Sequence, residues 1–259
     1  MLGLLVGYCA LFGLVVGSFL NVVIYRVPRK ESVVSPRSAC PSCAMPITAR
    51  DNIPIFSWLV LRGRCRGCRS PISMRYPLIE AATAGLFAGV AARIGFSWTL
   101  PAYLVLAAGL LALACTDLEH LLLPKRIVYP VLGMVAGSLL TAAAITGRWH
   151  DLLVACISAL VWFVIFFAMN FISPRALGFG DVRLAPVLGL ALGWLGVRYV
   201  LLGFFTANLI GAIIGIALIT SKRMSRQQQI PYGVFLAFGT LLAIFVGPEL
   251  LRPFQSIRV

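Results

Sequence analysis

Acidic residues are scarce in this chain of 259 residues, in which Asp and Glu number eight against 22 Lys and Arg. Charged residues make up only 12% of the chain and hydrophobic residues 60%, whereas an ordinary soluble domain is about 25% charged. The composition therefore excludes an ordinary soluble domain, and the large apolar share excludes a disordered chain. It predicts a membrane protein, in which every acid close to an apolar segment needs a specific reason.

Several common site patterns are missing as well. The two histidines, His120 and His150, are predicted to lie on opposite faces of the membrane, so we expect neither to be a metal ligand or part of a Ser/His/Asp or Cys/His site. Neither a Gly-x-Gly-x-x-Gly loop nor a Walker motif occurs, so the usual nucleotide-binding fingerprints are lacking.

Long uncharged apolar runs occupy most of the chain. A helix needs about 20 apolar residues to cross about 30 Å of hydrocarbon. The run 2–25 has no basic segment before it and exceeds a signal-peptide core, so we expect a retained span. The remaining runs are 76–92 (interrupted only by Glu80), 94–116, 127–147, 152–174, 199–221 and 227–248. The segment 184–197 is shorter, and its proline and three glycines fit either a short crossing or a re-entrant helix.

Counting segment 184–197 as crossing predicts an all-α polytopic membrane protein of about eight transmembrane helices. With 26–75 in the cytoplasm, cytoplasmic loops hold 17 Lys/Arg and outer loops five, as the positive-inside rule requires. The tally is the same if 184–197 is re-entrant, and both topologies place Asp117 and Asp181 at the cytoplasmic face. We expect three parts: a first span (1–25), a cytoplasmic subdomain (26–75) and a larger membrane domain (76–259).

Four cysteines in the 26–75 loop have the spacing of a metal site. Two Cys-x-x-Cys pairs are separated by 21 residues, and each pair fits a knuckle that offers two thiolates to a tetrahedral Zn²⁺; they are Cys40, Cys43, Cys65 and Cys68. Neighbouring arginines would favour the thiolates. Two disulfides or free thiols are the alternatives, and a cytoplasmic location disfavours persistent disulfides.

The same loop holds ten of the 22 basic residues, which could indicate nucleic-acid binding. The loop has few aromatic residues for stacking on bases, however, and the positive-inside rule already accounts for its charge. Attraction to anionic lipid headgroups needs no further partner. We therefore expect contact with membrane lipid and no nucleic acid.

Asp117 and Asp181 are candidate catalytic residues. Asp117 follows the run 94–116, where the helix dipole disfavours a carboxylate, and Asp181 ends the sequence Gly178-Phe179-Gly180-Asp181. If the two carboxylates converge, they share a proton and can hydrolyse a peptide bond by acid–base catalysis. The alternative reading of each is a snorkelling helix-end acid, or a charge partner of Lys125, Arg126 or Arg183.

These residues occur within an ordered set of motifs that resembles the type IV prepilin peptidases, membrane aspartic proteases of the Gly-x-Gly-Asp class. The set covers nearly the whole chain. Besides the four cysteines it comprises Gly17-Ser18-Phe19-Leu20-Asn21, Asn52-Ile53-Pro54, Arg75-Tyr76-Pro77 with Glu80, Asp117 with Pro124, Gly178-Phe179-Gly180-Asp181 and Pro231-Tyr232-Gly233. Tyr232 departs from the Phe that many relatives carry there.

The resemblance implies a bacterial inner-membrane enzyme that removes the leader of prepilins or pseudopilins on the cytoplasmic side, with Asp117 and Asp181 as the catalytic pair. It also implies N-methylation of the new N-terminus with S-adenosylmethionine as donor, and metal binding by the four cysteines in a structural zinc site. No residue pattern marks a site for the methyl donor.

Two further readings remain open at the level of sequence. A presenilin-like protease is disfavoured because Thr116 precedes Asp117 where that family has Tyr, and because Pro-Ala-Leu is absent. A non-enzymatic transporter or scaffold with a zinc ribbon is the alternative from another class. The sequence fixes neither the oligomeric state, a homo-oligomer being one option, nor which pilin is the substrate.

Overall fold

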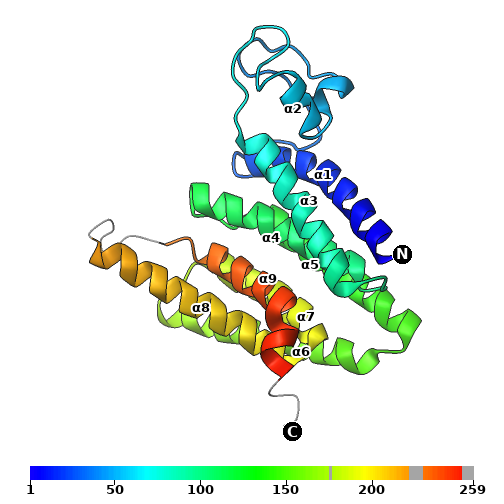
Figure 1. The fold of residues 1–259 in the computed structure, drawn as a ribbon. Coiled ribbons are helices and arrows are strands. Elements are labelled where there is room, and N and C mark those ends of the chain that lie inside the picture. Colours follow the sequence, from blue (N-terminus) through cyan, green and yellow to red (C-terminus); the bar gives the residue numbers. More distant parts are fainter. Residues whose placement is uncertain (175–176, 222–229, 253–259) are drawn as a thin grey trace. The chain divides into compact units, whose positions relative to one another are not determined.

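The computed structural model describes residues 1–174, 177–221 and 230–252, and within these ranges its regular elements are helices (Figure 1). The long helices are α1 (Leu2–Arg26), α3 (Arg75–Ile94), α4 (Leu100–His120), α5 (Lys125–Thr146), α6 (Trp149–Ile172), α7 (Phe179–Leu195), α8 (Val197–Thr220) and α9 (Tyr232–Leu251). All of them except α7 are long and apolar enough to cross a membrane. The predicted all-α membrane fold is confirmed.

Internal contacts divide the chain into two compact units, Met1–Phe96 and Ser97–Val259. In the first unit α1 and α3 pack antiparallel, and the contact is made through small residues. A Cβ on Gly13 would lie 2.8 Å from the Cα of Ala84, and one on Gly17 would lie 2.7 Å from the Cα of Glu80. Glycines four residues apart thus let the two backbones meet, as in small-xxx-small pairs of membrane helices.

The segment between α1 and α3 forms the cysteine module. It contains a 3₁₀ turn, η1 (Ala49–Asn52), and the short helix α2 (Phe56–Val60). Trp58 of α2 donates its indole N–H to the carbonyl of Ile72 and lies over Gly63, whose φ of +65° suits only glycine without strain. Trp58 therefore packs locally within this segment, and the separate subdomain expected from sequence remains a prediction.

In the second unit α7 is the central helix and packs against α4, α5, α6, α8 and α9. Its glycines again allow close approach: a Cβ on Gly189 or Gly193 would lie within 3 Å of the α6 backbone at Ser158 and Ala155. Tyr103 of α4 is fully buried and donates its hydroxyl to the carbonyl of Ala191 in α7. This bundle of six helices carries both candidate catalytic aspartates.

The structure bears on the short segment 184–197, for which the sequence allowed two topologies. The helix is longer than the apolar run, because it begins at Phe179 and takes Asp181 into its first turn. Its 17 residues extend about 25 Å and run antiparallel to α6, with Gly193 beside Ala155 and Leu177 bonded to Asn170. Whether this helix crosses the membrane or re-enters remains a prediction, because α7 is shorter than the helices that are long enough to cross.

Some residues used in the sequence predictions lie outside the described ranges. They are Arg175, Lys222, Arg223, Arg226 and Arg258 of the charge tally, and the first three residues of the run 227–248. The predicted boundary between residues 75 and 76 remains a prediction. By contacts, α3 belongs to the same unit as α1.

Candidate active site and four-cysteine centre

Asp117 lies in the last turn of α4 and is held at the N-terminus of another helix. Its side chain is 5% exposed, and the backbone N–H groups of Gly233 and Val234, in the first turn of α9, are directed at its carboxylate. The dipole of α4 disfavours a carboxylate at this end, whereas the free N–H groups of α9 stabilise one. The cost noted from sequence is thus offset by a helix distant in sequence.

Asp181 occupies the third position of α7, counted from the N-cap Gly178. Its carboxylate accepts a hydrogen bond from the backbone N–H of Gly178, which is the arrangement of the acidic residue in a capping box. A Cβ on Gly178 would lie 3.2 Å from the Asp181 Oδ2 atom. The residue is 7% exposed, so the helix start holds it away from bulk solvent.

The two aspartates converge at one end of the second unit. Their carboxylates interact electrostatically, and Leu123 lies between their supporting elements. A Cβ on Gly180 would meet Leu123 at 2.9 Å, and one on Gly233 would meet both Leu123 and the Asp117 Oδ2 atom at 2.9 Å. Glycine at 180 and 233 is therefore what lets α7 and α9 close around Leu123 and bring the two acids together.

Each acid also keeps one oxygen atom without a protein partner. Among the residues that the structure describes, no group bonds to the buried Asp117 Oδ2 or Asp181 Oδ1 atom. Buried polar atoms are nearly always hydrogen-bonded, so an orphan pair in one place needs an explanation. Two oxygens free to bond to a water molecule and a peptide carbonyl are what an aspartic protease requires.

Arg183, one of the three predicted charge partners of the aspartates, has another contact in the structure. The guanidinium of Arg183 lies over the ring of Phe179, 4.6 Å from its centroid. Ion pairs within the described ranges include Asp51–Arg66, Glu119–His120 and those of Asp151 with Arg148 and His150. The reading of Asp117 and Asp181 as ion-paired helix-end acids gains no support from these contacts.

A further residue of this region was noted from sequence only as a departure from the family pattern. Tyr232, the first residue of α9, donates its hydroxyl to the side-chain oxygen of Asn208 in α8 at 3.0 Å. It interacts electrostatically with Asp181. Its position beside the aspartates could not be found by motif spacing, because the contact joins residues of different helices.

The four cysteines of the module come together as their spacing predicts. Their Sγ atoms all lie within 4.8 Å of one another, with 3.7 Å between Cys40 and Cys68 and 4.0 Å between Cys43 and Cys65. Four sulfurs at 2.3 Å from a tetrahedral Zn²⁺ are separated by about 3.8 Å. All seven cysteines of the chain are free thiols, so the disulfide alternative gains no support.

The two knuckles have the same backbone structure. The N–H of Cys40 bonds to the carbonyl of Met45, and the N–H of Cys65 bonds in the same way to that of Ser70. Ala44 and Arg69, at equivalent positions, both have positive φ. The sequence carries a matching signal that cysteine spacing alone does not include, because Cys-x-x-Cys-x-x-Pro-Ile occurs at 40–47 and again at 65–72.

The surroundings favour the thiolate at Cys40 and Cys68, whereas at Cys43 the backbone N–H of Met45 is outweighed by the Cys68 side chain and burial, which raise the pKa to about 11. The backbone N–H of Cys43 and the hydroxyl of Ser70 lower the pKa of the Cys40 thiol to about 6. The same hydroxyl, 3.1 Å from the Cys68 Sγ atom, lowers the pKa of Cys68. Arg66, expected from sequence to support the thiolates, instead forms a bidentate pair with Asp51. A deprotonated four-sulfur cluster is what a structural metal ion requires.

Glu80 joins the module to α3. Its carboxylate accepts the backbone N–H of Ile55, the residue before α2, at 2.7 Å and also interacts with the side chain of Ser18. Asn21 of α1 donates to the carbonyl of Tyr76 at 3.2 Å. From sequence Glu80 appeared as the interruption of the run 76–92 and as part of the motif set, and the structure gives it this structural role.

Comparison with known proteins gives matches over both units. The family described as "Bacterial Peptidase A24 N-terminal domain" matches residues 11–94, and "Type IV leader peptidase family" matches residues 104–216. No solved structure matches.

Three relatives indicate how much of the chain is shared, and each bears the name "Prepilin leader peptidase/N-methyltransferase". The protein from Aeromonas hydrophila is 37% identical over 93% of this chain and 91% of its own length. That from Pseudomonas aeruginosa is 33% identical over 94% and 91%, and that from Myxococcus xanthus 42% identical over 85% and 67%. With these similarities spanning both the cysteine module and the aspartate bundle, the chain belongs to the type IV leader peptidase family, Peptidase A24.

Proposed function

We propose that this chain is a prepilin leader peptidase whose catalytic pair is Asp117 and Asp181. The observation that carries the assignment is the pair of orphan carboxylate oxygens, held together by Gly180, Gly233 and Leu123 at one end of the bundle. The names of the relatives supply the substrate class, a prepilin or pseudopilin.

The reaction follows from two carboxylates that share one proton. The ionised carboxylate takes a proton from a water molecule while the oxygen of that water attacks the scissile carbonyl. The protonated carboxyl gives its proton to the carbonyl oxygen. Collapse of the tetrahedral intermediate expels the amine, which takes a proton from the pair. The N–H groups of α9 and the N-cap of α7 hold the carboxylates in place throughout.

We place this site at the cytoplasmic face of a bacterial inner membrane. Support comes from the excess of Lys and Arg in the loops that would share a face with Asp117 and Asp181. Burial of the pair within the bundle limits solvent water, while its position at the ends of α4 and α7 lets an extended peptide approach from the membrane surface.

We further propose that Cys40, Cys43, Cys65 and Cys68 hold one structural Zn²⁺. The sulfur separations and lowered thiol pKa values support this site. The ion would supply no chemistry to the hydrolysis. It would crosslink the two knuckles and so stabilise a module that has few other core contacts.

The second activity proposed is methylation of the amine that cleavage releases, with S-adenosylmethionine as methyl donor. Its support is the "N-methyltransferase" in the names of the relatives. In this reaction the amine lone pair forms a bond to the donor's methyl carbon, the carbon–sulfur bond breaks, and the amine loses a proton.

One experiment tests both activities. Purified protein is incubated with a prepilin and S-adenosylmethionine, and the product masses are read. We expect loss of the leader and gain of one methyl group, with both absent from Asp117→Asn and Asp181→Asn variants that still insert into the membrane. Because acid–base groups contribute about 10²–10⁴ in rate, each variant should lose at least about 10²-fold in cleavage. Normal cleavage by either variant would defeat the assignment.

A further inference from the structure

The short helix α2 has one face inside the module and one face without a partner. Ser57 is buried, and Trp58 packs on Gly63. On the opposite side Phe56, Leu59 and Val60 are 60%, 59% and 59% exposed. These three positions have the i, i+3, i+4 spacing of one helix face, so a helix of five residues presents three large apolar side chains together.

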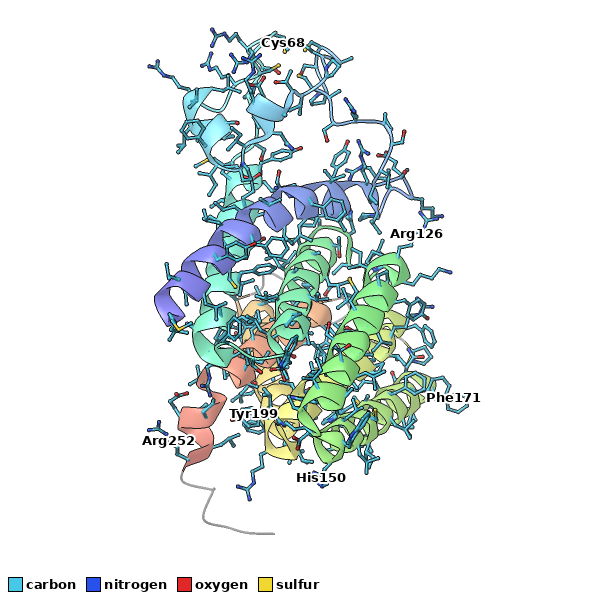
Figure 2. All side chains as sticks on the ribbon, turned by 90° about the vertical axis from the view of Figure 1, so that its right-hand side faces the viewer. Cys68, Arg126, His150, Phe171, Tyr199 and Arg252 are labelled. Atoms are coloured by element: carbon cyan, nitrogen blue, oxygen red, sulfur yellow. The ribbon has the colours of Figure 1, made fainter. Side chains whose placement is uncertain are left out.

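This face lies close to the end of a membrane-spanning helix. The N–H of Ile55, immediately before α2, bonds to Glu80 at 2.7 Å. Glu80 is five residues into α3, so α2 begins about 7 Å along that helix from its first residue. Figure 2 shows the Cys68 knuckle at the far side of the module, away from α1 and α3. The α2 helix is therefore held close to the point where α3 enters the membrane.

The charge around α2 complements one kind of surface. The segment 26–75 carries ten Lys/Arg against two acids, and Arg62 and Arg64, directly after α2, are exposed. Of the two acids, Asp51 is already paired with Arg66. Apolar side chains beside exposed arginines at a membrane surface match the boundary between acyl chains and anionic headgroups.

We propose that α2 is an interfacial anchor: Phe56, Leu59 and Val60 insert among the lipids of an anionic leaflet, and the adjacent arginines bind the headgroup phosphates. The anchor would fix the tilt of the cysteine module on the membrane. The inference rests on the crossing of α1 and α3 and is independent of the proposed reaction.

Photo-crosslinking of the full chain tests the anchor. Benzoylphenylalanine replaces Leu59, and the protein is placed in nanodiscs of phosphatidylglycerol and phosphatidylcholine, irradiated and analysed by mass. Ser42, an exposed residue between Cys40 and Cys43, receives the same group as the matched control. We expect a lipid adduct at position 59 at least about 5-fold more abundant than at position 42. Discs of phosphatidylcholine alone should reduce the yield at position 59 about 2-fold or more, because the headgroup attraction is lost.

The other outcomes contradict the proposal in distinguishable ways. A crosslink from position 59 to residues 97–259 would mean that the second unit covers α2. An adduct formed only with added prepilin would make the face a substrate-docking surface. Equal lipid adducts at positions 59 and 42 would rule out the proposed anchor. Equal yields in the two lipid compositions would rule out its preference for anionic lipid. The zinc content of both labelled proteins shows whether the module is folded.

Discussion

At the scale of single residues, the function of the aspartate site depends on positions that have no side chain. Gly180 and Gly233 leave room for Leu123 and for the Asp117 carboxylate, with Cβ clearances of 2.9 Å at both sites. A methyl group added at either position must displace a neighbour. At Gly233 one such neighbour is the Asp117 carboxylate, which takes part in the proposed reaction. In the proposed reaction, the two glycines would act on catalysis through geometry alone.

The first prediction concerns Gly233→Ala. The new methyl group should push the Asp117 carboxylate away from the N–H groups of α9, and a displacement of about 1 Å at a catalytic group costs up to about 10²-fold in rate. We expect kcat for leader cleavage to fall by roughly 10–100-fold in a prepilin assay, with zinc content unchanged. Gly137→Ala, where a Cβ meets nothing within 4 Å, is the control and should retain normal cleavage. Full activity of Gly233→Ala would contradict the packing around Asp117.

The second prediction concerns the zinc ligands. Cys43→Ser should lower zinc from one ion per chain to well below one, because a serine hydroxyl does not replace a thiolate ligand. Cys156→Ser, a change in the membrane helix α6, should retain a full complement. Metal analysis of the purified proteins measures both, and equal zinc in the two variants would rule out the four-cysteine site.

A third prediction concerns the Asp51–Arg66 pair in the same module. The Arg66 guanidinium, by its hydrogen bonds, holds the pKa of Asp51 below its usual range. The pair therefore stabilises the module above the ordinary pKa of about 3.9, and this contribution is lost as pH falls through the lowered pKa. Asp51→Asn should raise proteolysis of segment 26–75 modestly, by a similar factor at pH 5 and pH 7. A difference present at pH 7 and absent at pH 5 would show that the pair titrates at a higher pH.

At the scale of elements, helices in both units meet through small residues four positions apart. Gly13 and Gly17 serve the α1–α3 contact, and Gly189 and Gly193 serve the α6–α7 contact. In a bilayer the lipid is as apolar as the side chains, so close van der Waals packing replaces the hydrophobic effect as the source of association. Each of these helix contacts is therefore sensitive to any side-chain volume added at its glycines.

The fourth prediction follows from the α1–α3 contact. Gly17→Leu must separate the two helices, because the Glu80 backbone lies 2.7 Å from a Cβ at position 17. Overpacking costs about 1–3 kcal/mol or more, and we expect a lower thermal unfolding temperature of the detergent-solubilised protein. Gly7→Leu, on the same helix with no atom within 4 Å of its Cβ, should unfold near the temperature of the unchanged protein. Equal losses in both would mean that the contact contributes nothing.

At the scale of the whole molecule, hydropathy and cysteine spacing predicted most of the architecture. Seven apolar runs became helices of membrane-spanning length, and the four thiols converged. The apolar segment predicted from sequence starts at residue 184, because the charged residues Asp181 and Arg183 lie just before it. The helix starts earlier, at Phe179, and includes both of them. Charged residues in a first turn satisfy a helix terminus, which hydropathy does not measure.

The arrangement of the aspartate site was less accessible from sequence. The topology predicted from the basic residues placed Asp117 and Asp181 at one face of the membrane, but the N–H donors of Gly233 and Val234 come from a helix more than 110 residues beyond Asp117. Nor does periodicity indicate that Leu123 lies between Gly180 and Gly233. Such contacts depend on tertiary packing between helices whose apolar faces look alike in sequence.

A fifth prediction tests the orientation of the whole chain. An epitope tag before Leu2 should be removed by protease added to spheroplasts, while the module at 26–75 stays intact. Inverted membrane vesicles should give the reverse pattern, because the ten basic residues of the module keep it in the cytoplasm. Cleavage of the module in intact spheroplasts would overturn both the orientation and the cytoplasmic placement of the aspartates.

The glycine contacts of α6 with α7 also have a consequence for the response to temperature. A water-soluble core is held by a force that weakens on cooling, since its source is the hydration of apolar groups. Where Gly189 and Gly193 meet Ser158 and Ala155, the alternative to contact is lipid, and the attraction comes from close atomic packing. The bundle that holds the two aspartates should therefore keep its geometry in the cold. On cooling, the rate of the reaction should fall before the arrangement of the two aspartates is lost.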